Sequence, residues 1–451
     1  MKRRILLAAV LTALSIPQLP LAAAENPLRG AVVASVDREF PSLLALYTDL
    51  HRNPELSLME ERTAGVIAKE LRAAGVEVTE GFGGGFGVVG VLRNGPGPTV
   101  LLRADLDGLP VLEETGLPYA STRRTKNLAG QEVPVMHACG HDVHMTCLVG
   151  AARTLVALKD RWSGTLVFVG QPAEETGVGA RVMLAAGLYR RFPKPDFAIA
   201  LHDSATLPAG TVGLIEGFSM ANVDSVDITV RGVGGHGAYP HTTKDPVVLA
   251  ARIVLTLQTI VSRENRPVDP VVITVGSIHG GTKHNIIPDE VILQLTVRSY
   301  ADDVRARTLE AIRRVCRGEA IAAGLPEERM PVITVSETEF TPATYNDPAL
   351  TRRLRGTFER WFGTANVKSI DPEMGGEDFG RFGRTTEKVP ISLIRIGAVD
   401  PAAATESARN GTPLPSLHSS KFAPVPEPTL KTGVAALTAA ALDLLGAQGS
   451  P

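Results

Sequence analysis

The segment Val135-Met136-His137-Ala138-Cys139-Gly140-His141-Asp142-Val143-His144 concentrates three histidines, one cysteine and one aspartate beside a glycine. Thiolate and imidazole groups this close together are typical of a transition-metal site. The alternative is a buried cysteine beside surface histidines, which the segment alone does not exclude. An apolar stripe at helical spacing follows, so Cys139 and His141 are predicted to lie in the turn that begins a helix. The stripe comprises Met145, Leu148, Val149, Ala152, Leu155 and Val156.

Metal-binding side chains also follow three short apolar segments that we expect to be buried strands. These segments and the side chains after them are Thr99–Ala104 with Asp105 and Asp107, Thr165–Val169 with Glu174 and Glu175, and Phe197–Leu201 with His202 and Asp203. Open α/β sheets carry their ligand sites at the carboxyl ends of strands. A lone His or Glu is usually a loop or surface residue, but so many at successive strand ends favour a site. The pattern predicts an α/β fold with a polar site at one edge of its sheet. We include His418, late in the chain, among the candidate residues of this site.

The length of the chain and the order of its expected strands and helices predict more than one domain. At 451 residues the chain is too long for one ordinary core. After about Glu216 the patterns expected for strands and helices follow in the order βαββαβ, which is that of a ferredoxin-like domain. We expect a main domain formed by residues 25–216 and 337–451, with an α+β domain inserted over residues 217–336.

The N-terminal segment 1–24 is predicted to be a secretory signal peptide. Lys2-Arg3-Arg4 is a basic start, and Ile5 to Leu14 is an apolar run too short to span a bilayer comfortably. Leu21-Ala22-Ala23-Ala24 supplies small residues for cleavage. An uncleaved membrane anchor is the alternative. We expect export across the inner membrane to the periplasm, with no membrane partner once the segment is removed.

Composition and cysteine content further narrow the class of protein that the chain belongs to. Apolar residues make up 44% of the chain and charged residues 21%, as in soluble globular proteins. The formal net charge of -2 gives no reason to expect a nucleic-acid partner. The three cysteines are an odd number, so at least one is unpaired. Cys147 and Cys316 are predicted to be buried apolar side chains, and a Cys139–Cys147 disulfide is the alternative that a metal on Cys139 would prevent.

One glycine-rich segment matches a nucleotide-binding pattern without its context. Gly85-Phe86-Gly87-Val88-Val89-Gly90 has the spacing of the dinucleotide fingerprint. That fingerprint follows a strand and opens a helix. Here the glycines lead into Val88–Leu92, which has the pattern of a strand. We therefore interpret the segment as a turn before a strand and disfavour a nicotinamide enzyme.

The adjacent Glu174 and Glu175 have the chemistry of a hydrolytic metal site. Such a site needs one carboxylate on the metal and another beside the attacking water to accept its proton. Neighbouring residues project in different directions, so one glutamate is free to ligate while the other faces the water. The residues alone do not say which glutamate takes which role.

Several motifs together resemble the aminoacylase/carboxypeptidase family of metallopeptidases, and more narrowly its amidohydrolase subgroup of hippurate hydrolases and indole-acetyl-amino-acid hydrolases. The resemblance spans nearly the whole chain after the signal segment, in the family's order. It implies a zinc-peptidase-like α/β catalytic domain with an inserted ferredoxin-like lid and dimerisation domain. The motifs are His51-Arg52-Asn53-Pro54-Glu55-Leu56-Ser57, Arg103-Ala104-Asp105-Leu106-Asp107-Gly108, Met136 to Asp142, Gln171-Pro172-Ala173-Glu174-Glu175, Gly234-Gly235-His236, Asn285-Ile286-Ile287-Pro288, Gly375-Gly376-Glu377-Asp378-Phe379 and Leu417-His418-Ser419.

The resemblance also implies roles for individual residues. Two divalent metal ions per subunit are expected, zinc first, with manganese or cobalt as alternatives. Glu174 is the expected general base and acid, His236 the donor to the oxyanion, and Asn285 a further substrate contact. His236 is expected on the lid, reaching the site of a partner subunit in a homodimer or higher oligomer. The expected metal ligands are Cys139, His141, Glu175, His202 and His418.

Some positions depart from the family pattern. Asp105-Leu106-Asp107 lacks the metal-binding histidine that more distant relatives have there, so no ligand is assigned to Asp105. Asp107 and Asp142 are expected either to orient ligands or to cap a loop. Val143, Asp203 and Gly237 also differ from the subgroup.

The predicted function is metal-dependent hydrolysis of the amide bond of N-acyl amino acids or small peptides. One alternative is a cysteine hydrolase that uses Cys139 and His141. Another is a catalytically inactive periplasmic binding protein of the same fold, which the Glu174-Glu175 pair disfavours because a binding protein needs no base. Arg298 ends a predicted lid strand and receives no assigned role.

Overall fold

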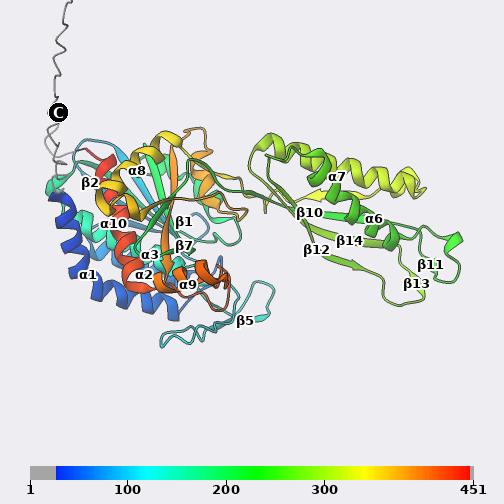
Figure 1. Cartoon of the computed structure of the whole chain (residues 1–451), viewed down its shortest axis with the longest axis horizontal. Coiled ribbons are helices and arrows are strands. Elements are labelled where there is room, and N and C mark those ends of the chain that lie inside the picture. The colour runs from blue at the N-terminus through cyan, green and yellow to red at the C-terminus, as the bar shows by residue number, and fades with distance from the viewer. Residues whose placement is uncertain (1–26, 447–451) are drawn as a thin grey trace, which may run out of the picture.

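The computed structural model describes residues 27–446, and the predicted signal peptide over residues 1–24 lies outside them. Figure 1 shows a larger α/β unit and an elongated smaller unit that extends from it. The smaller unit comprises residues 222–335, from the first to the last strand of its main sheet. It lies within the inserted domain that the sequence predicts; the exact boundaries at 216 and 336 stay predictions.

The larger unit is built on an eight-stranded mixed sheet. Strands β6, β3, β7 and β18 are parallel neighbours at its centre, and their carboxyl ends therefore meet at one edge. This is the edge that carries ligand sites in open α/β sheets. In spatial order the strands are β1 (Glu77–Phe82), β2 (Gly87–Asn94), β6 (Gly164–Gln171), β3 (Thr99–Asp105), β7 (Phe197–Pro208), β18 (Ile391–Val399), β8 (Val212–Leu214) and β17 (Val367–Ser369).

Helices cover both faces of this sheet, and the α/β fold class is confirmed. The larger core lies against α1 (Pro27–Arg52), α2 (Glu61–Ala73), α3 (His141–Ala157), α8 (Pro348–Phe362) and α10 (Pro426–Leu444). The opposite face packs on α4 (Gly179–Ala185), α5 (Leu188–Arg191) and the 3₁₀ helix η6 (Asp378–Gly383). Strands β3 and β6 have buried side chains at nearly every position, as expected for strands covered on both faces.

The smaller unit has the predicted ferredoxin-like order. Its antiparallel strands lie in the order β12-β14-β10-β15, with two helices, and a short β11–β13 pair extends from it. The bounds are β10 (Asn222–Arg231), α6 (Pro246–Thr259), β12 (Val271–Gly280), β14 (Glu290–Ser299), α7 (Asp302–Ala322) and β15 (Val332–Val335), with β11 (Gly235–His236) and β13 (Ile286–Ile287). Its core is separate from that of the larger unit.

Three helices begin at an Asp-Pro pair. Asp245, Asp347 and Asp400 each accept hydrogen bonds from backbone N–H groups of the first turn, in α6, α8 and α9 (Pro401–Asn410). The proline that follows lacks an N–H group and has its φ preset for the first helical position. The sequence therefore specifies these three starts locally.

Helix α6, continued by the π-helical segment Ile260–Glu264, is long and apolar enough to cross a membrane by length and composition. From the sequence we expect no stretch after the N-terminal segment to be apolar for long enough to cross a membrane, and by length and composition this helix corrects that expectation. The helix packs on the four-stranded sheet of the smaller unit through Leu249, Ile253 and Leu257. On its outer face, Val247, Val248 and Leu255 are exposed. The helix therefore has the burial pattern of a surface helix with one face packed on the sheet, and its outer face includes exposed apolar residues.

Two smaller predictions agree with the structure. The Gly85–Gly90 segment forms the turn between antiparallel strands β1 and β2 and the start of β2, so it does not open a helix. A nicotinamide site of the Rossmann type has no basis there. Cys147 and Cys316 are buried and unpaired, and Cys139 is also free of a disulfide.

Other predictions need correction. Strand β7 does not end before His202; it continues to Pro208, because parallel pairing with β18 extends as far as Pro208 opposite Val399. His418 lies in the loop between α9 and α10, not at a strand end. Helix α9 was not predicted, since its residues have no buried apolar stripe.

A buried ion-pair cluster joins the end of α1 to the start of α3. His51 Nδ1 donates to Asp142 Oδ2 at 2.7 Å, and Nε2 donates to Glu113 Oε1 at 3.0 Å. Burial alone would disfavour a charged ring, but the two carboxylates outweigh it and raise the pKa of His51 to about 10. The cluster is therefore a buried network of opposite charges that includes Asp142, and the orienting role expected for Asp142 stays a prediction.

Candidate metal centre

The centre begins at a sharp turn before α3. Gly140 has φ 73° and lies between Cys139 and His141. A β-carbon at this position would come within 2.1 Å of Asp203 Oδ2, so only glycine fits both the backbone conformation and the space. The turn places the thiol and the imidazole on the same side of the helix start.

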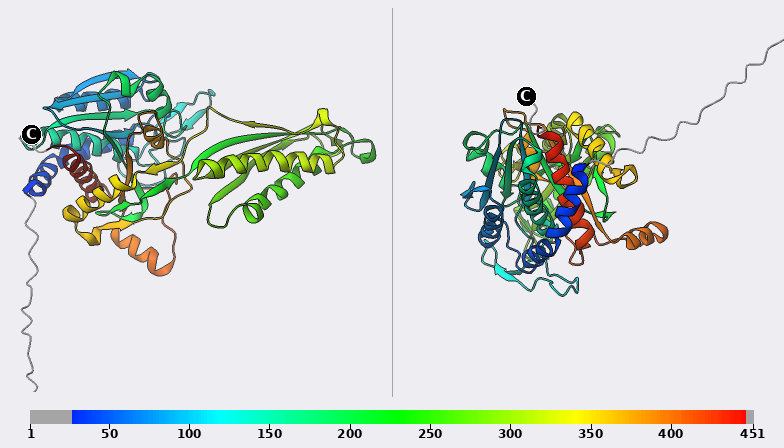
Figure 2. Two further views of the ribbon diagram at one scale, coloured as in Figure 1. Left: turned by 90° about the horizontal axis from the view of Figure 1, so that it is seen from above. Right: turned by 90° about the vertical axis from the view of Figure 1, so that its left-hand side faces the viewer.

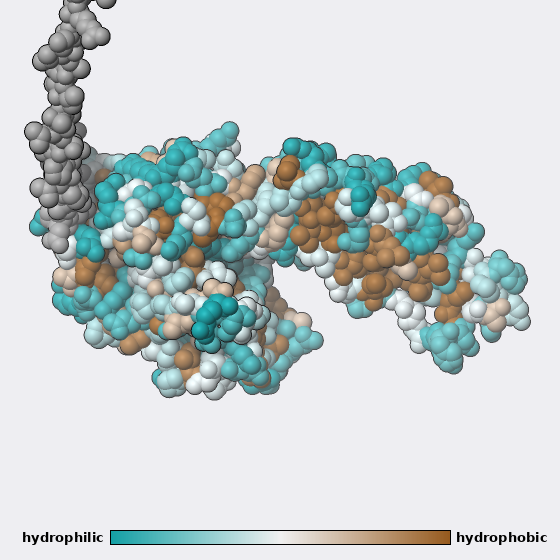
Figure 3. Space-filling model, in the orientation of Figure 1, coloured by the Kyte–Doolittle hydropathy of each residue, from teal (hydrophilic) through white to brown (hydrophobic). Residues whose placement is uncertain are grey.

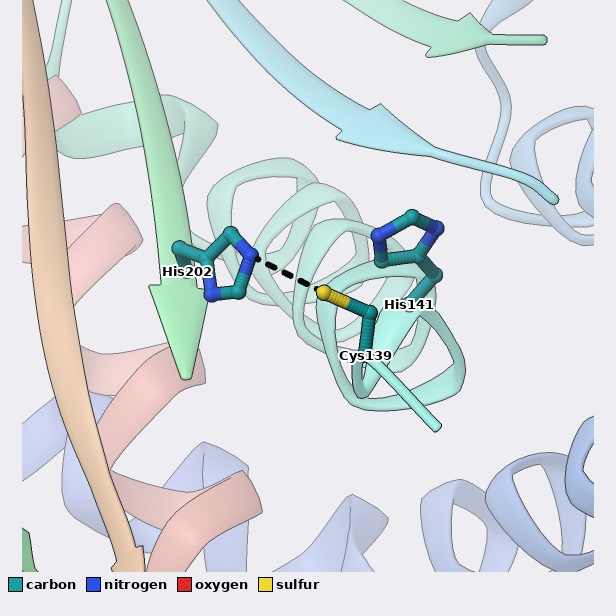
Figure 4. Close-up of side chains that lie close together, drawn as sticks. All are labelled: Cys139, His141 and His202. Carbon is teal, nitrogen blue, oxygen red and sulfur yellow. Dashed lines mark hydrogen bonds between the residues drawn. The ribbon is translucent and has the colours of Figure 1, made fainter. Parts of the chain in front are cut away.

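Three segments distant in sequence meet at the Cys139 thiol. Its Sγ lies 3.6 Å from His202 Nε2 and 3.3 Å from His418 Nε2. Figure 4 shows Cys139 and His141 at the beginning of α3, facing His202 on β7. His418 itself has φ 66°, an uncommon conformation for a residue with a side chain, which indicates that its loop is held in a specific path.

Glu175 completes the group, and Glu174 lies beside it. His141 Nε2 is 3.7 Å from Glu175 Oε1 and 4.0 Å from Glu174 Oε2, and His418 Nε2 is 3.6 Å from Glu175 Oε2. The structure therefore brings together all five predicted ligands and the predicted base. They come from the α3 start, the segment after β6, strand β7 and the loop after α9.

Backbone carbonyl groups orient two of the imidazole rings. His141 Nδ1 donates to the Asp107 carbonyl at 2.7 Å, and His202 Nδ1 donates to the Asp203 carbonyl at 2.7 Å. Because Nδ1 of each ring donates to a carbonyl, Nε2 faces the centre and would present a lone pair to a bound metal ion. Asp107 also accepts the Glu175 N–H at 3.0 Å, so it acts as the predicted orienting residue.

The unpartnered atoms fit metal ions. Among the described residues, His141 Nε2 and Glu175 Oε1 are buried and have no hydrogen-bond partner. Two ligand atoms bound to one zinc ion at about 2.0–2.3 Å lie roughly 3.3–3.8 Å apart in tetrahedral geometry. The separations around Cys139 and between His141 and Glu175 fall in that range. Thiolate, imidazole and carboxylate donors at these distances therefore suit divalent transition metals.

Among several groups of possible ligand residues in the described part of the chain, two overlap at the Cys139 thiol. One set contains Cys139, His141 and His202, and another contains Cys139, Glu175 and His418. Cys139 belongs to both. The residues of these two groups would be able to hold divalent metal ions.

Asp105 and His144 lie behind the ligands and bond to each other. His144 Nδ1 donates to Asp105 Oδ1 at 2.6 Å, and His144 Nε2 accepts the Asp203 N–H at 3.0 Å. Asp105 Oδ2 accepts from Arg103 at 2.7 Å. With both oxygens engaged, Asp105 is not required as a ligand, in agreement with the sequence. His137 is buried, its pKa is lowered to about 4 by burial, and it has no hydrogen bond among the described residues.

The Gly-Gly-Glu-Asp-Phe motif supplies a part of the centre that the sequence did not assign. Arg103 is fully buried and bonds to Glu377 at 2.9 Å and to Asp378 at 3.1 Å. Burial, followed by the charges of Glu377 and Glu175, raises the pKa of Glu174 well above its ordinary value. A carboxylate in such surroundings is a strong proton acceptor when ionised.

The Cys139 thiol is poorly placed to act as a nucleophile. Burial, and next the charge of Glu175, raises its pKa well above the ordinary value. Nucleophilic cysteines need the opposite, a thiolate stabilised at neutral pH. The geometry therefore disfavours the cysteine-hydrolase alternative.

A cavity of about 630 Å³ opens beside the centre, between the two units. Cys139, His202 and His418 line it from the larger unit, and Arg298 on β14 lines it from the smaller unit. The Arg298 guanidinium is half-buried and donates to the Met374 carbonyl, with no acidic partner among residues 27–446.

His236 and Asn285 are not near the centre of the same chain. Both are exposed and lie at the β11–β13 pair, at the end of the smaller unit farthest from the large sheet (Figure 1). His236 Nδ1 accepts the Ala238 N–H at 3.0 Å, so Nε2 carries the proton and is available as a donor. The roles predicted for these two residues stay predictions.

Glu60 was also missed by the sequence reasoning. It is fully buried at the start of α2, and its Oε1 accepts the Ala173 N–H at 2.7 Å. Ala173 has φ 52°, a left-handed conformation that costs energy for a residue with a side chain. Glu60 therefore holds the strained turn that precedes Glu174 and Glu175. Glu60 lies three residues after the His51–Ser57 motif, and this closeness was the only signal in the sequence that pointed to a role for it.

A mixed sheet covered by helices, with thiolate, imidazole and carboxylate groups converging at one of its edges, is the arrangement of a metal-dependent hydrolase of the α/β class. The comparison with known families names it: the profile of Peptidase family M20/M25/M40 matches residues 101–410, more than half of the chain, and the chain belongs to this family. The predicted resemblance and the predicted class, a metal-dependent amidohydrolase, are confirmed.

Individual relatives extend the similarity over most of the chain. Thermostable carboxypeptidase 2 of Saccharolobus solfataricus is 37% identical over 397 residues, which are 87% of this chain and 93% of that protein. Hippurate hydrolase of Campylobacter jejuni is 36% identical over 338 residues, 74% of this chain and 82% of that one. The structure of Bacillus subtilis YXEP protein, a dinuclear metal binding peptidase, superimposes with a TM-score of 0.71 at 27% identity, covering 91% of this chain and all of that chain.

Replacement of Glu60 by alanine is expected to lower kcat for an N-acyl amino acid by about 10- to 100-fold, because small displacements of catalytic groups cost on this order. Glu60→Gln keeps an oxygen acceptor for Ala173 and should retain most activity. Steady-state kinetics and the metal content of each purified variant test this, with the exposed neighbour Glu61→Ala as control. Equal losses in the Ala and Gln variants, or full activity of Glu60→Ala, would contradict the role.

Proposed function

We propose that the protein hydrolyses the amide bond of N-acyl amino acids or small peptides, with two divalent metal ions held by Cys139, His141, Glu175, His202 and His418. The observation that carries the proposal is the convergence of these ligands, which include the unpartnered buried atoms His141 Nε2 and Glu175 Oε1, beside the buried carboxylate of Glu174. Relatives that include a hippurate hydrolase and a carboxypeptidase support the substrate class.

Bound metal ions would polarise the amide carbonyl and make water acidic enough to act as a nucleophile near neutral pH. Zinc suits the thiolate and imidazole donors best, and manganese or cobalt are alternatives that the carboxylate admits. His141 and His202 present Nε2 because their Nδ1 protons are held by backbone carbonyls. This preorganisation lowers the cost of assembling the centre.

Glu174 is assigned the proton transfers. A carboxylate oxygen of Glu174 accepts a proton from the attacking water and later delivers it to the amine nitrogen of the leaving group. Its burial and its acidic neighbours favour the protonated form. The surroundings of Glu174 therefore favour acceptance of the proton, and nearby bound cations would favour its release.

Arg298 is assigned the carboxylate of the substrate's amino-acid portion. Its guanidinium faces the cavity without an acidic partner among the described residues. A guanidinium fork suits a carboxylate better than an ammonium group does. This contact would orient the scissile amide toward Glu174.

His236 and Asn285 are assigned to the site of a partner subunit in a homodimer. His236 Nε2 would donate to the oxyanion, with Asn285 beside it. Support comes from the exposed apolar face of α6, where Val247, Val248 and Leu255 lie, and Figure 3 shows hydrophobic residues gathered over this part of the smaller unit. Exposed apolar surface of this kind marks association sites.

We also propose export to the periplasm, with removal of residues 1–24. The support is the basic Lys2-Arg3-Arg4 start followed by an apolar run and small residues before Glu25. The intact mass of protein recovered from a periplasmic fraction should correspond to a chain that begins at Glu25. A full-length chain retained in the membrane fraction would instead indicate an anchor.

Glu174→Gln is expected to bind metal as the wild type does and to lose turnover by at least about 10²-fold, because a positioned proton acceptor typically contributes 10²–10⁴-fold. Chelation of the wild type should abolish activity, and added zinc, manganese or cobalt should restore it. Kinetics on N-acetyl, N-benzoyl and dipeptide substrates, together with metal analysis, give the result. Turnover retained in Glu174→Gln would reject the assigned base.

The partner role of His236 is testable by complementation. His236→Ala and Glu174→Gln should each be nearly inactive, since loss of an oxyanion donor costs about 10²–10³-fold. Co-expressed and purified through two different tags, the mixed dimer contains one site with both residues intact if His236 acts across the interface. It should recover about half of the wild-type activity per dimer, as expected from a two-fold symmetric assembly. Absence of recovery in a dimer confirmed by light scattering would place His236 elsewhere.

A further inference from the structure

A second cavity, of about 450 Å³, adjoins the catalytic cavity. The two share Glu373 and Leu417 in their walls, and Asp203 in the second cavity directly follows the ligand His202. Leu417 also precedes the ligand His418. A group that extends from a substrate at the metal centre therefore has a short path into this space.

Helix α9 forms one wall of the second cavity. Ala404, Ser407 and Ala408 line it, at the spacing of one helical face. The helix has no buried residue, and both views in Figure 2 show it projecting from the larger unit. It adds little to the hydrophobic core of the fold, and its inward face of small residues leaves the cavity open.

The lining of the cavity is mainly apolar and lacks a positive charge. Ala205, Ala404, Ala408, Leu414 and Leu417 contribute the apolar surface. The two charged residues in its wall, Asp203 and Glu373, are both acidic, and no basic side chain lines it among residues 27–446. Among residues 27–446 this cavity therefore offers a substrate carboxylate no basic partner, whereas Arg298 lines the catalytic cavity from the smaller unit.

An N-acyl amino acid has one charged portion and one uncharged portion on either side of its amide bond. With the carboxylate at Arg298 and the amide at the metal centre, the acyl group points away from Arg298. We propose that the cavity beside α9 binds the acyl group, and that its volume and apolar walls select ring-sized aromatic or branched acyl groups over acetyl. This inference rests on the proposed function and names the substrate class for it.

The test places a larger side chain on α9 so that it occupies part of the cavity. Ala404→Trp should lower kcat/KM for N-benzoyl amino acids by at least about 10-fold relative to the N-acetyl derivative of the same amino acid, since contacts of one or two carbon groups in an apolar pocket already change selectivity about 10- to 200-fold. Ala402→Trp is the matched control, because Ala402 lies on the same helix, is exposed and does not line the cavity.

A second variant works in the opposite direction. Leu414→Ala enlarges the cavity from the loop after α9, so it should improve kcat/KM for an acyl group larger than benzoyl, such as naphthoyl, relative to benzoyl. Binding is measured separately in the inactive Glu174→Gln background by calorimetry with N-benzoylglycine and N-acetylglycine. The Ala404→Trp change should weaken binding of the benzoyl compound alone.

The outcomes separate this inference from the proposed function. Selectivity that shifts in Ala404→Trp and not in Ala402→Trp supports the acyl site. An active wild type whose benzoyl-to-acetyl ratio is unchanged in both Ala404→Trp and Leu414→Ala overturns the acyl site and leaves the proposed function standing. A metal-loaded wild type that turns over no N-acyl amino acid overturns both.

Discussion

The accumulation of buried negative charge at one edge of the large sheet is the constraint on which the rest of the centre depends. Asp105, Glu174, Glu377 and Asp378 are removed from water within one region, and an unpaired buried carboxylate is costly. Arg103 offsets part of this charge with a guanidinium that is itself completely buried. The remaining charge faces imidazole rings and the proposed divalent cations. Bound cations would balance charge that the side chains leave uncompensated, and this would link folding to metal binding.

At the same edge, the conformation and the hydrogen bonds of the backbone orient the proposed ligands. Gly140 permits a turn that no residue with a β-carbon would fit, and Glu60 holds Ala173 in a left-handed conformation. Carbonyl groups of Asp107 and Asp203 orient two imidazole rings. These features position the proposed ligands and the base, and they do not themselves take part in the reaction. They explain how side chains from distant segments present unpartnered atoms to a common point.

In the proposed function, the two units divide the recognition of a substrate between them. The smaller unit contributes Arg298 to the cavity, and the larger unit contributes the metal centre and α9. Because charge lies on one side and apolar surface on the other, the arrangement suits a molecule with one charged and one uncharged end. The β11–β13 pair lies too far along the smaller unit to serve the same chain's centre as drawn in Figure 1, so its predicted role depends on a second copy.

Much of this architecture was predictable from local patterns. Cys139 and His141 before an apolar helical stripe, acidic pairs after buried strands and the βαββαβ order near residues 222–335 are local features, and the structure agrees with each. Other features were not. Strand β7 runs past His202 because β18, nearly two hundred residues later, pairs with it, and α9 has no apolar stripe to reveal it.

The sequence by itself determined the chemistry available, since residue types and their short-range spacing decide which groups are able to bind metal or move a proton. It also determined the helix starts at Asp-Pro pairs and the turn at Gly140. Only the tertiary structure decided which groups meet. It set Glu174 and Glu175 against His141, closed the centre with His418, and paired Arg103 with Glu377 and Asp378. The reason is physical: distances between segments far apart in the chain, and the loss of water around them, arise only when the sheet and its helices pack.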